Sequence, residues 1–188
     1  MNTSEIGIVG LGTMGKNLAL NFARKGISVS VINKENEITE HFLMENSHES
    51  NIRGFKGIGE FVSSLSIPRV VLLLVTAGSP VDEVIESLIP YLEKGDIIID
   101  SGNSHYKDTE RRYSYLKEKG LSFLGMGISG GAEGALNGPA LMPGGDYIAY
   151  KEVEAKLKLV AAKSRYGPCV DYMGERSAGH FVKMVHNG

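Results

Sequence analysis

Apolar segments along this chain alternate with segments that have the spacing of amphipathic helices. The first apolar segment includes Ile6, Ile8 and Val9, and a helical pattern follows it through Phe22. Further apolar segments at 28–32, 69–75, 97–99 and 121–124 are predicted to be strands, with helices between them. Such alternation of strand and helix predicts an α/β fold of the doubly wound Rossmann type, in which a mainly parallel sheet carries helices on both faces.

The remaining segments are assigned from the same periodicities. Helices are predicted from the first glycine cluster to Gly26 and at 36–47, 58–65, 80–88, 107–119, 152–162 and 177–188. Polar residues predict a loop at 46–51, and the abundance of glycine predicts a long loop at 125–145. Extra strands toward the C-terminal end are predicted at 146–150 and 169–172.

Glycines follow the first predicted strand with the spacing G-x-G-x-x-G and precede a predicted helix. In this context Gly10 permits a tight turn, Gly12 lets the backbone approach a pyrophosphate, and Gly15 lets the helix pack close to the strand. The phosphates then meet the free N–H groups and the positive end of the helix. The alternative is a strand-to-helix turn without function. The predicted cofactor contacts in this segment are Gly10, Leu11, Gly12, Thr13, Met14 and Gly15.

The second predicted strand ends at Asn33-Lys34-Glu35. An acidic residue at this place binds the ribose hydroxyls of NAD, whereas a polar or basic residue leaves room for the 2′-phosphate of NADP. Asn33 followed by Lys34 favours NADP, although Glu35 weakens the inference. The alternative is an ordinary solvated turn.

Other polar segments follow later strands and are expected on the same rim, because ligands of such sheets lie beyond the carboxyl ends of the strands. Thr76 follows one strand and Asn103 another. The glycine-rich segment 125–145 exposes many N–H groups, which together with the Ser129 hydroxyl suit an anionic or oxygen-rich ligand. The alternative for this segment is a flexible connector.

The last predicted helix, 177–188, is amphipathic. At 100° per residue its polar stripe consists of Gly179, Lys183, His186 and Asn187. The other side carries Ala178, Phe181, Val182, Met184 and Val185. An ammonium, an imidazole and an amide on one stripe are suited to a binding or catalytic site. A solvated face is the equally weighted alternative.

Composition narrows the function classes. The 188 residues carry a formal net charge of −2 with mixed signs, which gives no electrostatic footprint for nucleic acid or for an anionic membrane. No apolar run approaches the roughly 20 residues of a membrane span, and residues 1–5 are not a signal peptide, so a cytoplasmic protein is expected. The single cysteine, Cys169, is interpreted as a packed thiol. No metal site is predicted, because no His/Cys/Asp cluster has ligand spacing.

Five motifs spread over the whole chain can be compared with known families. They are Gly-Leu-Gly-Thr-Met-Gly at 10–15, Asp-Ser-Gly-Asn-Ser at 100–104 with Tyr106-Lys-Asp-Thr109 and Arg111-Arg112 after it, Ser-Gly-Gly-Ala-Glu-Gly at 129–134, Gly-Pro-Ala-Leu-Met-Pro-Gly-Gly at 138–145, and Gly-His-Phe-Val-Lys-Met-Val-His-Asn-Gly at 179–188. Together they resemble the 6-phosphogluconate dehydrogenase family, and the last two are highly specific.

The resemblance implies roles for individual residues. Lys183 would be the general base, and Asn103 would contact both substrate and cofactor. Further substrate contacts would come from Ser129, Gly130, Gly131, His186 and Asn187. Further cofactor contacts would come from Asn33, Lys34, Glu35, Val75, Thr76 and Ala77. The implied reaction is the oxidative decarboxylation of 6-phospho-D-gluconate to D-ribulose 5-phosphate and CO₂ with reduction of NADP, NAD being possible, in the pentose phosphate pathway. The whole enzyme would be a homodimer.

The sequence departs from the family in two places. The family commonly has arginine and threonine where this chain has Lys34 and Glu35. Family members also continue with a long helical part that supplies a catalytic glutamate and basic residues for the substrate phosphate. We therefore expect residues 1–176 to form the dinucleotide-binding Rossmann domain and 177–188 to begin the helix that links to an absent all-helical domain. Residues 1–188 alone are expected to bind cofactor without turnover.

Two other functions remain open at this point. A β-hydroxyacid dehydrogenase shares the G-x-G-x-x-G motif, a glycine-rich substrate loop and the helix lysine, but is not expected to carry His186 beside Asn187 or the segment 138–145. A dinucleotide-sensing module without chemistry is the other alternative, and the polar stripe around Lys183 argues against it for the whole protein.

Overall fold

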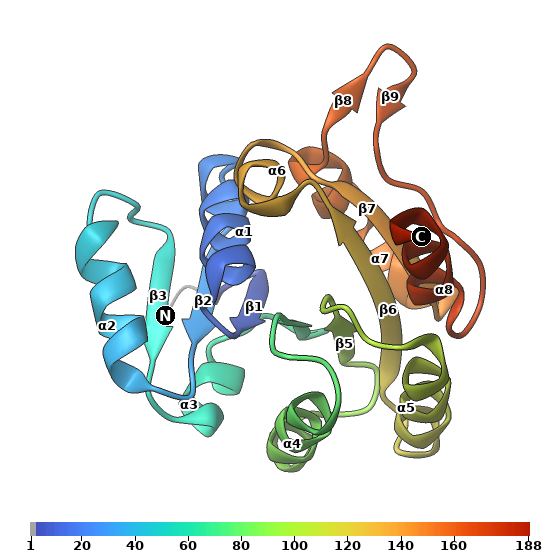
Figure 1. The fold of residues 1–188 in the computed structure, drawn as a ribbon. Coiled ribbons are helices and arrows are strands. Elements are labelled where there is room, and N and C mark those ends of the chain that lie inside the picture. The colour runs from blue at the N-terminus through green and yellow to red at the C-terminus, as the bar shows by residue number, and fades with distance from the viewer. Residues whose placement is uncertain (1–2) are drawn as a thin grey trace.

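One mainly parallel sheet organises the protein, whose computed structural model describes residues 3–188 (Figure 1). Its strand order is β3-β2-β1-β4-β5-β6-β7, in which β1 to β6 pair in parallel and β7 runs antiparallel to β6. The strands are β1 (Ile6–Val9), β2 (Val29–Ile32), β3 (Ile52–Phe55), β4 (Val70–Leu73), β5 (Ile97–Asp100), β6 (Ser122–Ser129) and β7 (Ala140–Gly145). The predicted Rossmann-type α/β fold is confirmed.

Helices cover both faces of this sheet because the central strands are apolar on both sides. Ile8 and its neighbours pack with Phe22 of α1 (Thr13–Arg24), Phe42 of α2 (Asn36–Glu45) and Val153 of α7 (Tyr147–Val160). On the opposite face Leu73 and its neighbours pack with α3 (Ile58–Ser63), α4 (Ser79–Leu88) and α5 (Tyr106–Glu118). A 3₁₀ turn, η1 (Ile89–Tyr91), follows α4, and α6 (Gly131–Asn137) lies beside α1.

The last helix, α8 (Ala178–Asn187), lies across β6 and β7 beside α5 (Figure 1). It approaches the sheet so closely that a Cβ added at Gly179 would overlap the carbonyl oxygens of Gly125 and Met142. Only a glycine therefore permits this packing. No helix in the part of the chain from 3 to 188 is long and apolar enough to cross a membrane.

The edge strand β3 was not predicted from the sequence. β3 lies at the edge of the sheet, next to β2, and follows the predicted polar loop at 46–51. Its sequence Ile-Arg-Gly-Phe is short, and Arg53 and Gly54 interrupt the apolar pattern. An edge strand needs no continuous apolar run, which is why the periodicity gave no signal here.

The prediction of a long loop at 125–145 is wrong. β6 continues to Ser129, α6 follows, and β7 pairs antiparallel with β6 from Ala140 to Gly145. The pairing of β6 with β7 continues through their glycines, and Gly127 and Gly144 leave the space that α8 occupies. Only short connections within the predicted loop remain irregular.

Two predicted C-terminal strands are also wrong. Residues 147–150 belong to α7, because the Asp146 carboxylate accepts hydrogen bonds from the backbone N–H groups of Ile148 (2.9 Å) and Ala149 (3.3 Å) and so caps the helix. In 169–172 the structure has only an isolated bridge between Leu141 and Val170. The extra strands here are the hairpin β8 (Lys163–Ser164) and β9 (Gly167–Pro168), which projects from the body in Figure 1. The division of the chain at 176/177 stays a prediction.

Candidate functional site

The glycine motif forms the turn that its spacing predicts. Gly10 has φ +99°, which lies in the region that favours glycine, and a Cβ at Gly15 would overlap the Gly10 carbonyl oxygen. The N-cap of α1 is Gly12, whose position has no side-chain cap. The first N–H groups of this helix are thus left for a ligand, as an anion-binding helix end requires.

Asn33 connects this turn to the tip of β2. Its side-chain oxygen accepts a hydrogen bond from the Leu11 N–H (2.8 Å), and its amide nitrogen donates to the Glu35 carboxylate (2.8 Å). The Glu35 carboxylate is thereby bonded to Asn33, and both Glu35 and Lys34 are exposed. A phosphate near the tip of β2 would therefore meet the ammonium of Lys34 and a carboxylate already engaged by an amide.

A cavity of about 660 Å³ extends from the glycine turn past the tip of β2. Its lining combines the turn, the β2 tip, the connection from β3 to α3, the end of β4 and one side of α4, and comprises Val9, Gly10, Gly12, Ile32, Asn33, Lys34, Glu35, Lys56, Ile58, Leu74, Val75, Thr76, Pro80, Glu83, Val84 and Ser87. Of the cofactor contacts predicted in the glycine motif, four do not line it: the Leu11 side chain is in the core, with 2% of its surface exposed, and Thr13, Met14 and Gly15 belong to α1. Ala77 and Asn103 do not line it either.

A second cavity of about 640 Å³ shares Leu74, Val75 and Thr76 with the first, so the two form neighbouring halves of one rim. Its lining is drawn from the ends of β4, β5 and β6 and from α8, and comprises Met14, Leu74, Val75, Thr76, Ala77, Ser101, Gly102, Asn103, Ile128, Ser129, Gly130, Gly131, Lys183 and Asn187. The structure therefore brings together the predicted base, the predicted substrate loop and Asn103.

Among the residues that line this second cavity, Lys183 is the only one with a titratable side chain. It is 9% exposed, and burial lowers the pKa of its ammonium from the ordinary value of 10.5. A Cβ added at Gly127 of β6 would lie 2.9 Å from Lys183 Cγ, so the lysine stem occupies the space that this glycine leaves. The geometry favours a lysine that is neutral more often than a surface lysine.

One part of the polar stripe of α8 faces the sheet, and the other part is exposed to solvent. Gly179 and Lys183 face the sheet, whereas His186 and Asn187 are exposed, with His186 Nδ1 3.5 Å from Asn187 Oδ1. Asn187 lines the second cavity and His186 does not. The apolar side remains open within the described residues: Phe181, Met184 and Val185 are 47%, 42% and 63% exposed.

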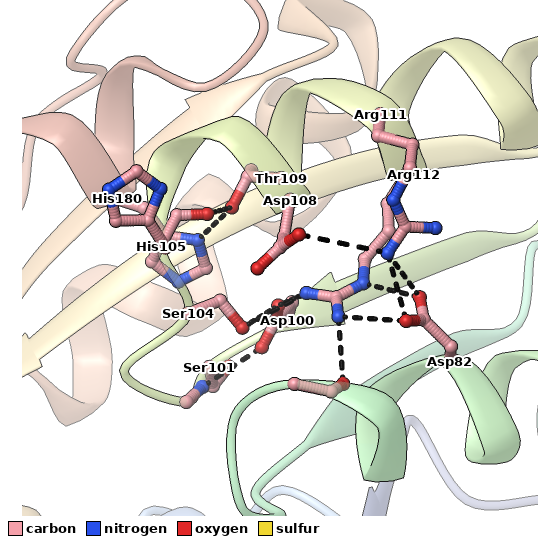
Figure 2. A network of polar contacts seen from close by, with 12 residues as sticks. Asp82, Asp100, Ser101, Ser104, His105, Asp108, Thr109, Arg111, Arg112 and His180 are labelled. Atoms are coloured by element: carbon pink, nitrogen blue, oxygen red, sulfur yellow. Dashed lines mark hydrogen bonds and ion pairs between the residues drawn. The ribbon is translucent and has the colours of Figure 1, made fainter.

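Sequence reasoning missed a buried polar cluster behind the second cavity (Figure 2). Its centre is Arg112 of α5, which contacts Asp82, Asp100 and Ser104, and His180 of α8 lies nearby beside Thr109. The available signal was the charged residue Asp100 at the end of the buried run Ile-Ile-Ile. No group of His, Cys, Asp and Glu within the described range 3–188 is arranged to hold a metal ion.

Comparison with known proteins places these features in a family. Residues 5–174 match the model described as the NAD binding domain of 6-phosphogluconate dehydrogenase. Two Bacillus subtilis enzymes are similar over nearly all of the chain: the NADP(+)-dependent decarboxylating 6-phosphogluconate dehydrogenase at 52% identity (100% of this chain, 40% of the enzyme) and the NAD(+)-dependent one at 51% (98% and 39%).

Among solved structures, Plasmodium falciparum 6-phosphogluconate dehydrogenase superposes with a TM-score of 0.93 at 44% identity, covering 97% of this chain and 39% of that one. It was determined in its apo form, with its cofactor NADP+ and with its substrate 6-phosphogluconate. This chain thus spans about two fifths of the length of the relatives that it matches.

Proposed function

The chain belongs to the 6-phosphogluconate dehydrogenase family, and from this premise we propose that it is the cofactor-binding part of an enzyme that oxidatively decarboxylates 6-phospho-D-gluconate. The observation that carries the proposal is the second cavity, where a buried lysine, an amide and a glycine-rich turn meet at the rim that also holds the dinucleotide motif. Family membership sets aside the alternative of a β-hydroxyacid dehydrogenase. We also propose a cytoplasmic location.

The residues present fit a dinucleotide. The first helix offers N–H groups without a side-chain cap for the pyrophosphate, and the cavity at the β2 tip can take the adenosine half. The second cavity, on the other side of the reversal between β1 and β4, then takes the nicotinamide half and the substrate. When bound, the nicotinamide accepts a hydride.

NADP is the proposed cofactor, with NAD as a weaker ligand. Two relatives of almost equal identity use different cofactors, so similarity alone does not decide the preference. The support comes from the β2 tip, where one oxygen of the Glu35 carboxylate already accepts a hydrogen bond from the Asn33 amide and is therefore less available to a ribose diol. Lys34 beside it supplies a positive charge for a 2′-phosphate.

Lys183 is the proposed general base. Because burial lowers the pKa of its ammonium, its neutral form can accept the proton of the substrate C3 hydroxyl while the hydride leaves C3. Asn103 and the turn at 129–131 would hold the oxygen-rich substrate in the cavity by an amide and by backbone N–H groups. Lys183 becomes an ammonium in this step.

The oxidised substrate is a 3-keto acid, whose C1–C2 bond can break because the C3 oxygen takes up the electron pair. The Lys183 ammonium then returns its proton to that oxygen, which leaves an enol and CO₂. Conversion of the enol to the ketone requires a proton at C2 from an acid. No carboxyl, imidazole or phenol lines the second cavity in the part of the chain that the structure describes.

We therefore propose that residues 1–188 by themselves bind the cofactor but do not convert 6-phosphogluconate. The test has two parts. The complete natural protein that contains these residues should reduce NADP+ in the presence of 6-phosphogluconate and release CO₂. Residues 1–188 should bind 2′,5′-ADP and NADPH in calorimetry and give no turnover. A complete protein that is inactive with 6-phosphogluconate would refute the proposed activity. Turnover by residues 1–188 would refute only the proposal that this part binds cofactor without catalysing the reaction.

A further inference from the structure

Arg112 is the largest fully buried side chain of the described residues, with 1% of its surface exposed. On one side its Nε donates to the Asp82 carboxylate of α4 (2.8 Å) and its Nη2 donates to the Gly78 carbonyl (2.9 Å). Gly78 ends the connection that follows β4 and precedes α4. The guanidinium thus holds the loop 75–78 at its last residue.

On its other side Arg112 reaches the loop that follows β5. Its Nη1 donates to the Ser104 hydroxyl (3.1 Å) and lies 3.4 Å from the Asp100 carboxylate. That carboxylate in turn accepts hydrogen bonds from the Ser104 hydroxyl (2.6 Å) and from the Gly102 N–H (3.1 Å). Both ends of the segment around Asn103 are therefore fixed to one buried ion pair (Figure 2).

The two loops meet at the second cavity. Val75, Thr76 and Ala77 of the first and Ser101, Gly102 and Asn103 of the second all belong to its lining. A Cβ at Gly102 would lie 3.1 Å from the Val75 carbonyl oxygen, so the loops are in near contact. The Arg112 guanidinium bonds to both loops.

The charges in this cluster depend on one another. Burial alone would raise the pKa of the Asp82 carboxyl, yet the guanidiniums of Arg112 and Arg111 hold that pKa below its ordinary value. A buried ion pair is weak evidence for stability, because apolar residues of equal volume often serve as well. Arginine is the side chain that can bridge several oxygens in a fixed planar geometry. The presence of an arginine in this cluster is therefore better explained by the positions in which it holds its partners than by a gain in the stability of the fold.

We propose that Arg112, acting through Asp100 and Ser104, is a positioning residue that fixes loop 101–104 against loop 75–78 and so orders the nicotinamide half of the site. Arg112 contacts neither the glycine turn nor the tip of β2, on which the adenosine half is mainly built. This inference rests on the proposed function, since it assumes that the two cavities receive the two halves of NADP.

The test separates the halves with two probes on residues 1–188. NADPH occupies both halves, and the fluorescence of its reduced nicotinamide reports on that ring; 2′,5′-ADP occupies only the adenosine half. Ser104→Ala removes one buried hydroxyl from the cluster and keeps the ion pair. We expect its NADPH dissociation constant to rise about 3- to 10-fold, as for one lost hydrogen bond, with a smaller fluorescence enhancement. The 2′,5′-ADP dissociation constant should change less than about 2-fold.

Ser63→Ala, at an exposed position of α3, is the matched control and should change neither constant. Arg112→Lys should weaken NADPH binding more than Ser104→Ala does, because a compact ammonium cannot bond to both loops at once. Unchanged NADPH binding and fluorescence in Ser104→Ala would overturn the proposal, as would equal weakening of both probes in that variant. An unaltered chain that binds neither probe would instead overturn the proposed function. An unaltered chain that binds NADPH without any fluorescence change would overturn the ordering of the nicotinamide half.

Discussion

Thr109 Oγ1 and His180 Nδ1 lie 2.7 Å apart and join α5 to α8 across 71 positions of sequence. Gly125 of β6 lies beneath the pair, where a Cβ would come within 2.9 Å of His180 Nδ1. His180 is 1% exposed, and its Nε2 has no hydrogen-bond partner within the described residues 3–188. Because His180 stands one helical turn before Lys183, this contact helps to set the position of the proposed base.

The stability of the protein should depend on the protonation of His180. Burial lowers the pKa of its imidazole below the ordinary 6.5, although the nearby Asp100 carboxylate acts in the opposite direction and Arg112 in the same one. The folded state therefore holds the imidazole neutral while the unfolded state takes up a proton near pH 6.5. The stability is full above that pH, and the free energy of unfolding should fall as the pH drops below it, by at most about 1.4 kcal/mol per unit.

Denaturant unfolding of residues 1–188 between about pH 7.5 and 5.5 measures this dependence. His180→Gln should flatten it, since glutamine does not titrate. His41→Gln, at an exposed position of α2, is the matched control and should leave the slope as it is. A slope that is the same in both variants would show that His180 is not responsible.

Substitution of Gly179 should detach α8 from the sheet. A Cβ at this position would overlap the Gly125 and Met142 carbonyl oxygens, which are backbone atoms that cannot rotate away. We expect Gly179→Ala to destabilise the protein by about 1–3 kcal/mol, the range for overpacking, or to free the helix locally. Hydrogen exchange of the α8 amides distinguishes the two, and protection equal to that of the unaltered chain would contradict the prediction.

Gly134→Ala is a suitable control for this experiment. A Cβ there would meet its nearest atom at 3.5 Å, which is ordinary contact, and the residue lies within α6. The replacement should be neutral or stabilising by about 0.4–1 kcal/mol, because alanine restricts the unfolded chain.

The strands buried on both faces could be predicted from the sequence, because β4 and the first three residues of β5 are continuous apolar runs. The helical face with Lys183 could be predicted from its period. β7 could not be predicted, because the proline and glycines in its sequence Ala-Leu-Met-Pro-Gly-Gly are typical of turns. In the structure these residues form a strand against which α8 packs. The periodicity of a segment reports on that segment alone. It does not show which strand a distant helix will pack against, and so where small residues are required.

The candidate site shows the same limit. Asn103 could be placed at the rim because it follows a predicted strand. Arg112 could not be recognised, because Asp82 lies 30 positions before it and Asp100 lies 12 positions before it, and only the packing of α5 against α4 and β5 brings the three together. A long-range ion pair leaves no local pattern in the sequence.

Lys183→Arg tests the proposed base in the complete natural protein. Arginine keeps a positive charge but does not lose its proton near neutral pH, so it cannot accept the proton of the C3 hydroxyl. We expect kcat to fall by roughly 10² to 10⁴, the usual loss for a general base. The dissociation constant of 2′,5′-ADP should stay unchanged, which controls for folding, and a near-normal kcat would exclude Lys183 from this role.

Lys34 should determine much of the preference for NADP over NAD. Its side chain is exposed at the β2 tip and lines the first cavity, and a lysine can meet the 2′-phosphate as a point charge. Arginine would bond to that phosphate through two N–H groups, and the nearby Glu35 carboxylate offsets part of the attraction, so the preference should be modest. A charge-assisted contact contributes about 1.5–3 kcal/mol, which predicts about 10- to 100-fold tighter binding of NADP+ at low salt.

Calorimetry on residues 1–188 with both cofactors measures the ratio of the two dissociation constants. Lys34→Ala should bring this ratio close to one by weakening the binding of NADP+ alone. Lys25→Ala, an exposed lysine just after α1, should leave the ratio unchanged. Equal affinities in the unaltered chain, or a ratio that survives Lys34→Ala, would mean that another group, such as the Lys56 ammonium that lines the same cavity, binds the phosphate.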